Sequence, residues 1–135
     1  MKKILALSLA VLTGGCMAER PMEVNDARTQ TRLAEELQGR VQAGPPQSCV
    51  PQRNLRGNES AGEGAIIFRG PSSDLVYVNR PPAGCPEIRA GRAIKVRTTQ
   101  TQLCRGDIVE VFDPVSGFGY GGCGLGDFTP YRRQR

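Results

Sequence analysis

Four cysteines constrain the chemistry of this chain through their spacing: Cys49, Cys85, Cys104 and Cys123. A structural zinc site usually takes its thiolates from paired CxxC knuckles, and a redox-active dithiol usually forms a CxxC motif at a helix start. The chain has neither, and it contains no histidine that could activate a cysteine nucleophile. We therefore expect no metal and no cofactor, and we expect two structural disulfides.

Three pairings of these four cysteines are possible. We predict Cys85–Cys104, which would close the segment around a basic strand, and Cys49–Cys123, which would tie the beginning of the domain to its end. Such loops stabilise a fold by about 3 and about 4 kcal/mol in the chain-entropy description. A small domain with few aromatic residues would need that contribution.

A glycine-rich stretch, Gly117–Asp127, contains the GxGxxG spacing of dinucleotide-binding turns. That fingerprint works only between a strand and a helix whose N-terminus holds the pyrophosphate. Pro130 and an arginine-rich segment follow, which leaves no room for the helix and the second strand. We therefore expect no nucleotide to bind. The glycines should instead permit positive φ angles, a bulge or tight packing around Cys123.

Other residues that could do chemistry are isolated along the sequence. Asn79 and Asp107 lie near cysteines, and we expect turn and cap hydrogen bonds from them rather than a site. Arg105–Asp107 spells RGD, and we expect an ordinary turn before a strand there. The sequence shows no paired carboxylates, no Ser/His dyad and no phosphate loop, so we expect no enzyme activity.

The formal net charge of +5 comes from basic residues that are scattered along the chain. Nucleic-acid binding needs a basic stripe with stacking aromatics, and the chain has no tryptophan and only 5% aromatic residues. We therefore expect no nucleic-acid partner. The candidate binding residues are the cations Lys95 and Arg97 of an alternating segment, and Arg132 and Arg133 near the end of the chain. They would suit an envelope protein or an anionic polymer.

The segment from residue 47 onward predicts short strands between Gly, Pro and Ser clusters. A hairpin is expected from Ala65–Arg69 and Leu75–Asn79, because Gly70–Asp74 between them is rich in turn formers. Further strands are expected at Ala93–Thr98, Ile108–Phe112 and Phe118–Cys123. In the first of these, Ile94 and Val96 alternate with the two cations, so one face should be exposed to solvent.

An N-terminal helix is predicted over Asn25–Ala43, where a thin apolar stripe recurs in steps of three and four residues and Gly44–Pro46 follows. We expect it to dock partly on the domain after a tether. The predicted fold is mainly β, a small antiparallel sandwich or barrel of about five to six strands preceded by this one helix. The predicted organisation is residues 1–15 as a signal peptide, 16–46 as tether and helix, and 47–135 as a disulfide-stapled β domain.

The first residues resemble a bacterial lipoprotein signal. Lys2 and Lys3 precede the apolar run Ile4–Leu12, which is too short to span a bilayer. Leu12–Cys16 (LTGGC) is similar to the lipobox, which implies that Cys16 is lipidated and anchors the chain to a membrane. By the sorting rule of enteric bacteria, Met17 favours the outer membrane, facing the periplasm. Secretion with cleavage after Ala18 and an uncleaved anchor are the alternatives.

The cysteine-containing half of the chain resembles an uncharacterised family of small exported proteobacterial proteins. The similarity rests on Cys49 and on the motifs IIFR at Ile66–Arg69, YVN at Tyr77–Asn79, CP at Cys85–Pro86, LC..D at Leu103–Asp107 and CGLGDF at Cys123–Phe128. It implies a shared framework and no activity. The sequence thus favours a non-catalytic envelope lipoprotein that binds a partner; the alternative is a small periplasmic hydrolase or redox accessory protein.

Overall fold

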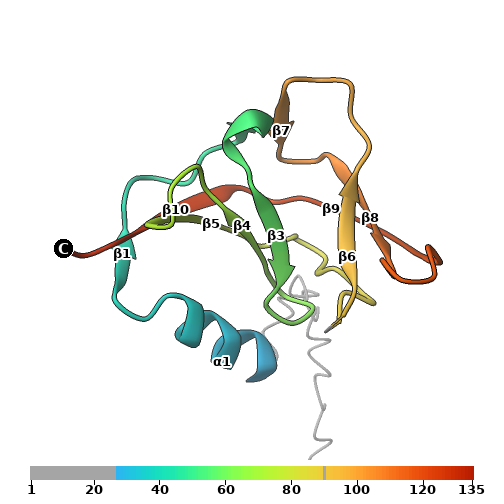
Figure 1. Ribbon diagram of the computed structural model, residues 1–135, viewed down its shortest axis with the longest axis horizontal. Coiled ribbons are helices and arrows are strands. Elements are labelled where there is room, and N and C mark those ends of the chain that lie inside the picture. Colours follow the sequence, from blue (N-terminus) through green and yellow to red (C-terminus); the bar gives the residue numbers. More distant parts are fainter. Residues whose placement is uncertain (1–26, 90) are drawn as a thin grey trace, which may run out of the picture.

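A computed structural model describes residues 27–89 and 91–135, so Cys16 and the predicted signal peptide lie outside the described residues. The described part contains one helix, α1 (Ala27–Glu36), a short 3-10 turn at Gln52–Asn54 and ten strands (Figure 1). The strands are β1 (Arg40–Gln42), β2 (Cys49–Pro51), β3 (Gly57–Ser60), β4 (Ile66–Arg69), β5 (Leu75–Asn79), β6 (Ala93–Val96), β7 (Gln102–Cys104), β8 (Ile108–Phe112), β9 (Gly119–Gly124) and β10 (Phe128–Arg133).

The strands form antiparallel sheets in a sandwich-like arrangement, as the sequence predicted, and they close no barrel within the described residues. A five-stranded sheet has the order β1-β10-β5-β4-β3, a three-stranded sheet has the order β6-β8-β9, and β2 pairs with β7. In Figure 1 the five-stranded sheet occupies the left and centre, and β6, β8 and β9 lie on the right. The predicted hairpin is present as β4 and β5, with Phe68 opposite Tyr77.

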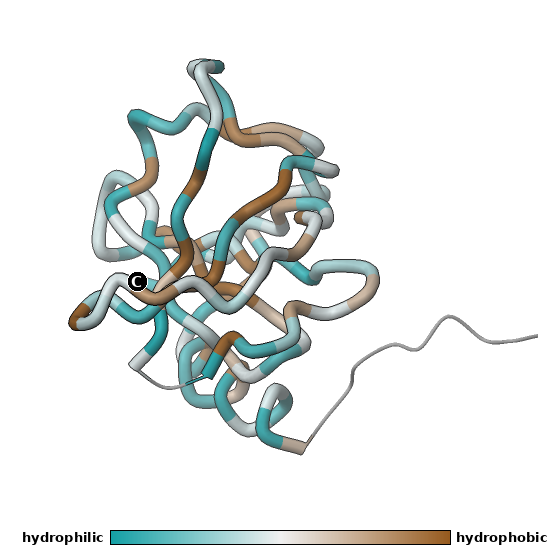
Figure 2. Tube along the Cα trace, turned by 90° about the vertical axis from the view of Figure 1, so that its right-hand side faces the viewer, coloured by the Kyte–Doolittle hydropathy of each residue, from teal (hydrophilic) through white to brown (hydrophobic). Residues whose placement is uncertain are grey.

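The five-stranded sheet is buried on both faces. On one face Phe68, Tyr77 and Phe128 join the main core, which also contains Val109 and Val111 of the three-stranded sheet. On the other face Ile67, Val76 and Val78 pack with Leu33 of α1. All five residues of β5 are therefore buried. In Figure 2 the hydrophobic stretches lie mainly along the strands in the interior, and the connecting loops are mostly hydrophilic.

The helix is docked but shorter than predicted. It ends at Glu36, and Gly39, with φ +70°, follows it. The next residues form β1, which pairs with β10, so Arg40–Gln42 belong to the sheet and not to the predicted helix. Leu33 and Thr29 are the residues of the helix that are buried against the domain. The Thr29 hydroxyl also accepts a hydrogen bond from the Gly64 N–H at 3.1 Å. The long-range pairing of β1 thus overrides the helical pattern after residue 36.

The number of strands exceeds the five or six that the sequence predicted. The short strands β1, β2, β3 and β7 and the C-terminal strand β10 were not expected. In particular, Arg132 and Arg133 lie in β10, opposite Val41 and Arg40 of β1. The basic C-terminal segment is therefore part of the sheet, although the Arg132 and Arg133 side chains remain exposed.

The predicted disulfide pairing was wrong as well, although all four cysteines form bridges. Cys49 pairs with Cys104, and Cys85 pairs with Cys123. The first bridge follows from the register of β2 and β7, which places Cys49 directly opposite Cys104. The second links the segment after β5 to β9, and its sulfurs lie in the main core. Chain order alone does not reveal these neighbours.

Non-reducing peptide mapping should recover the peptides joined by Cys49–Cys104 and by Cys85–Cys123. Under a mild reductant Cys49–Cys104 should open first, because both of its residues are half-buried whereas Cys85 is fully buried and Cys123 is 7% exposed. Alkylation followed by mass spectrometry measures the order. A Cys85–Cys104 peptide, or earlier opening of the core bridge, would contradict this arrangement.

Candidate functional site

The outer face of the three-stranded sheet carries the cations that the sequence predicted to be exposed. Ile94 is buried, while Lys95 and Arg97 are exposed, so the expected alternation is confirmed. Strand β8 alternates in the same way, with Val109 and Val111 buried. Its outward residue Glu110 lies opposite Lys95 in the register. The outer face therefore places one carboxylate between two cations.

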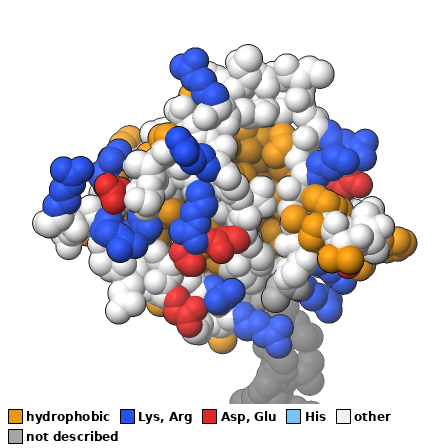
Figure 3. Space-filling view, in the orientation of Figure 1, with side chains coloured by type: hydrophobic (Ala, Val, Ile, Leu, Met, Phe, Trp, Pro, Cys, Tyr) orange, Lys and Arg blue, Asp and Glu red, His pale blue; other side chains and the backbone are white. Residues whose placement is uncertain are grey.

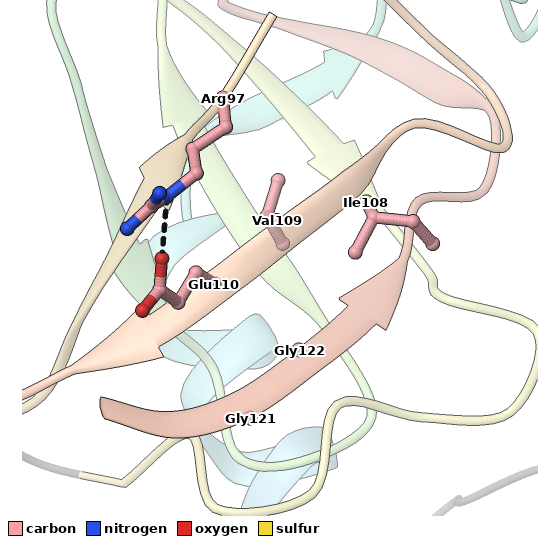
Figure 4. Close-up of a pocket in the computed structure, with 6 residues that line it drawn as sticks. All are labelled: Arg97, Ile108, Val109, Glu110, Gly121 and Gly122. Carbon is pink, nitrogen blue, oxygen red and sulfur yellow. Dashed lines mark ion pairs between the residues drawn. The ribbon is translucent and has the colours of Figure 1, made fainter.

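A shallow groove of about 520 Å³ crosses this face. It is lined by Arg97, Ile108, Val109, Glu110, Gly121 and Gly122. Figure 4 shows Arg97, just after β6, and Glu110 of β8 pointing toward each other across the groove. Their ion pair joins Arg97 Nε to Glu110 Oε2 at 2.7 Å, and the Arg97 side chain remains 68% exposed. Because most of the Arg97 side chain is exposed, its guanidinium is accessible to a ligand. An exposed ion pair of this kind also contributes little to stability.

Glycines of β9 line the groove and let β9 lie close to β8. A Cβ on Gly122 would lie 2.6 Å from the Val109 carbonyl oxygen, and one on Gly124 would meet the end of Ile108 at 3.6 Å. Gly121 has φ +97°, which favours glycine. These residues explain the GxGxxG spacing: the stretch runs from a hairpin turn into β9, and strand β10 comes next instead of a phosphate-binding helix.

The loop between β8 and β9 is held by its own hydrogen bonds. Asp113 Oδ1 accepts the N–H groups of Val115 at 2.7 Å and Ser116 at 3.1 Å. These two bonds, first that of Ser116 and then that of Val115, lower the pKa of Asp113. The Asp113 N–H donates to the Phe118 carbonyl at 2.9 Å, which closes the loop.

The base of this loop rests on an aromatic and arginine stack. Phe118 meets Tyr120 edge to face with ring centroids 5.0 Å apart, and the Arg92 guanidinium lies 3.5 Å from the Tyr120 ring centroid. Arg92 also bonds Glu87 through its carbonyl at 2.7 Å and its carboxylate at 2.6 Å. Glu87 has φ +70°. The hydrogen bond from Arg92, followed by the charge of Arg89, lowers the pKa of Glu87.

The structure does not bring the predicted cations together. Lys95 and Arg97 lie on or just after β6 of the three-stranded sheet, whereas Arg132 and Arg133 lie at the end of β10 in the five-stranded sheet, near the C-terminus in Figure 1. There they are close to Arg40, whose pKa is lowered first by desolvation and then by Arg133 and Arg69. In Figure 3 basic side chains are spread over the visible surface, several of them beside acidic ones, and form no continuous stripe.

Asn79 and Asp107 have structural roles; Asp107 makes a local turn hydrogen bond as the sequence predicted, whereas Asn79 bonds a residue 47 positions away and not a turn or cap. Asn79 is fully buried, and its amide donates to the Gly126 carbonyl at 2.7 Å and accepts the Gly126 N–H at 2.9 Å. Asp107 accepts the Cys104 N–H at 2.7 Å. The Arg105 side chain pairs with Asp127 at 3.4 Å. The RGD tripeptide is therefore a turn whose two charged side chains are both engaged.

No three His, Cys, Asp or Glu side chains within the described residues come together to hold a metal. A second hollow of about 910 Å³ is lined by the start of α1, the β3–β4 turn and residues 88–89, and its lining includes Arg28, Arg32, Arg89 and Glu63. Arg32 and Arg89 pair with Glu35 and Glu87. No helix in the described part of the chain is long and apolar enough to cross a membrane.

Sequence reasoning missed several residues of the outer face. Glu110 and Ile108 were not singled out, although the alternation of β8 resembles that of β6 and predicts the same exposed face. Phe118 was assigned to a strand, and it is instead the last residue of the loop before β9, with 63% of its surface exposed. No protein-family model, curated protein or solved structure matches the chain.

Replacing Gly126 by alanine should destabilise the domain by about 2–3 kcal/mol. A Cβ there would overlap the Arg80 carbonyl oxygen and disturb the pairing with Asn79. Gly57→Ala in β3 is the matched control, since nothing lies within 4 Å of its Cβ position and its φ is ordinary. We expect that control to change stability by less than about 1 kcal/mol. Urea unfolding followed by circular dichroism measures both; equal effects would contradict the close packing at Gly126.

Proposed function

We propose that this chain is a non-catalytic lipoprotein of the bacterial cell envelope, with a β domain that binds an envelope protein or an anionic polymer. The observation that carries the proposal is the outer face of the three-stranded sheet. There Lys95 and Arg97 are exposed beside an open groove, and Glu110 is the carboxylate between them. The lipid anchor at Cys16 and the outer-membrane location, facing the periplasm, are part of the proposal and rest on the N-terminal sequence.

The shape and charge of this face suit an extended, negatively charged ligand. The groove is shallow, so it would contact one side of a chain and would not enclose a small molecule. Two cations against one carboxylate give the face a positive balance, which attracts anionic polymers at moderate ionic strength. The glycines of β9 expose backbone to which such a chain could lie close.

The chemistry of the described residues supports a binding role over the hydrolase or redox alternative. All four cysteines there are bridged, and the Cys85–Cys123 sulfurs are in the core, away from a redox partner. Asp107 is engaged with Cys104, Asp113 with its loop, and Glu87 with Arg92. Glu36 and Glu59 lie close together, but both pair with the Arg69 guanidinium, so an arginine occupies the place between them that a substrate would need in acid–base hydrolysis.

Lipidation is tested on the protein purified from membranes of an expressing bacterium. Mass spectrometry should find an N-terminal peptide that begins at Cys16 and carries acyl chains. Cys16→Ser should abolish acylation of the protein, because only the thiol accepts the lipid. A mature chain that begins at Glu19 without acyl groups would contradict the anchor and would leave the binding face untouched.

The binding face is tested by in-cell crosslinking with two matched variants. Lys95→Glu/Arg97→Glu reverses two charges on the outer face, and Arg132→Glu/Arg133→Glu makes the same change in net charge at β10. We expect the first variant to reduce capture of an envelope component about tenfold and the second to change it little. The difference should be larger at low salt, where exposed charges are less screened. Circular dichroism checks folding; loss of capture only in the β10 variant would exclude the outer face.

A further inference from the structure

Exposed hydrophobic side chains concentrate on one hairpin. Among the described residues four large hydrophobic side chains are exposed, and three of them belong to the β8–β9 hairpin: Ile108 at 65%, Val115 at 96% and Phe118 at 63%. Val115 and Phe118 lie in the loop between the strands, residues 113–118, which we call the hairpin tip. The tip projects at the right of Figure 1, and apolar side chains gather at the same edge in Figure 3.

The hairpin tip is structured by its own hydrogen bonds. The bonds from Val115 and Ser116 to Asp113 fix its first half. Gly117, with φ +74°, donates its N–H to the Asp113 carbonyl at 2.8 Å and turns the chain back. Val115 and Phe118 are thus held outward by a structured loop. Binding through them would cost little conformational entropy, which favours association.

The occupant must accept two protruding apolar side chains beside cations. Lys95 lies on the outer face of the same sheet, opposite Glu110 and near the end of β8 that leads into the tip, and Arg92 supports the base of the tip through Tyr120, close to Asp113. A convex apolar tip with a Lys and an Arg near its base matches the interface of an anionic bilayer, where apolar groups enter the acyl boundary and cations meet the head groups. We propose that the hairpin tip inserts Val115 and Phe118 into an anionic membrane surface.

The length of chain before the described residues makes this contact reachable. Ten residues, 17–26, separate Cys16 from Ala27, and at about 3.3–3.6 Å per residue they span at most roughly 35 Å. A domain of this size has a radius of gyration of about 13 Å. The inference rests on the lipid anchor of the proposed function, because the anchor keeps the domain within one tether length of the bilayer. Insertion of the tip would then fix which side of the domain faces the membrane.

The test uses tryptophan as a reporter, because the chain contains none. Val115→Trp places an indole at the hairpin tip, and Val41→Trp places one on β1, at another exposed valine of the same molecule. The mature full chain is placed in vesicles of phosphatidylglycerol and phosphatidylcholine that carry nitroxide-labelled lipid. We expect the tip indole to be quenched at least about twofold more than the β1 indole, with an emission shift to shorter wavelength.

Two comparisons decide the result. Adding Phe118→Asp to Val115→Trp should reduce quenching at position 115 to the level of position 41, and vesicles of phosphatidylcholine alone should weaken it. Equal quenching at positions 115 and 41 would overturn the proposal. A blue shift at 115 without lipid quenching would also overturn it, since the tip would then contact protein.

Mass spectrometry of the same samples reports acylation, so failure of the anchor is distinguished from failure of the tip.

Discussion

The burial of the five-stranded sheet on both faces is the constraint on which the rest of the structure depends. Alternate residues of β5 face opposite layers, with Tyr77 in the main core and Val76 and Val78 under α1. Each such buried aliphatic side chain stabilises the fold by about 1.5–3 kcal/mol relative to exposure. Because β5 also pairs with β10, the two-sided burial sets the position of the C-terminal strand. Asn79 at its end then fixes Gly126 through a pair of buried hydrogen bonds.

The three-stranded sheet has a different balance. Its inner face contributes Ile94, Val109 and Val111 to the main core, while no layer covers its outer face in the described structure. The Cys85–Cys123 bridge secures β9, a strand whose glycines provide few side chains for packing. The five-stranded sheet is thus buried on both faces, whereas the three-stranded sheet packs one face in the core and presents the other to a partner.

The sequence predicts the features that local pattern determines. The β4–β5 hairpin has apolar runs around a strong turn, and the alternation of β6 places its cations outward, so both were predicted correctly. Strands β1 and β3 are short and polar, and β10 contains a proline and two arginines; their existence depends on pairing with distant residues. The disulfide partners depend on the same long-range pairing. The Arg97–Glu110 contact was missed because it joins two strands whose register the sequence alone does not reveal.

The place of β10 in its sheet has a consequence for the order of folding. It lies between β1 and β5, although it is the last of the described strands in the chain. A chain that emerges with its N-terminus first can form the local β4–β5 hairpin early. It must wait for β10 before β1 has a neighbour and before Phe128 can meet Phe68. Such non-local closure is slow, and until β10 pairs, one edge of β5 has no partner and Phe128 is missing from the core.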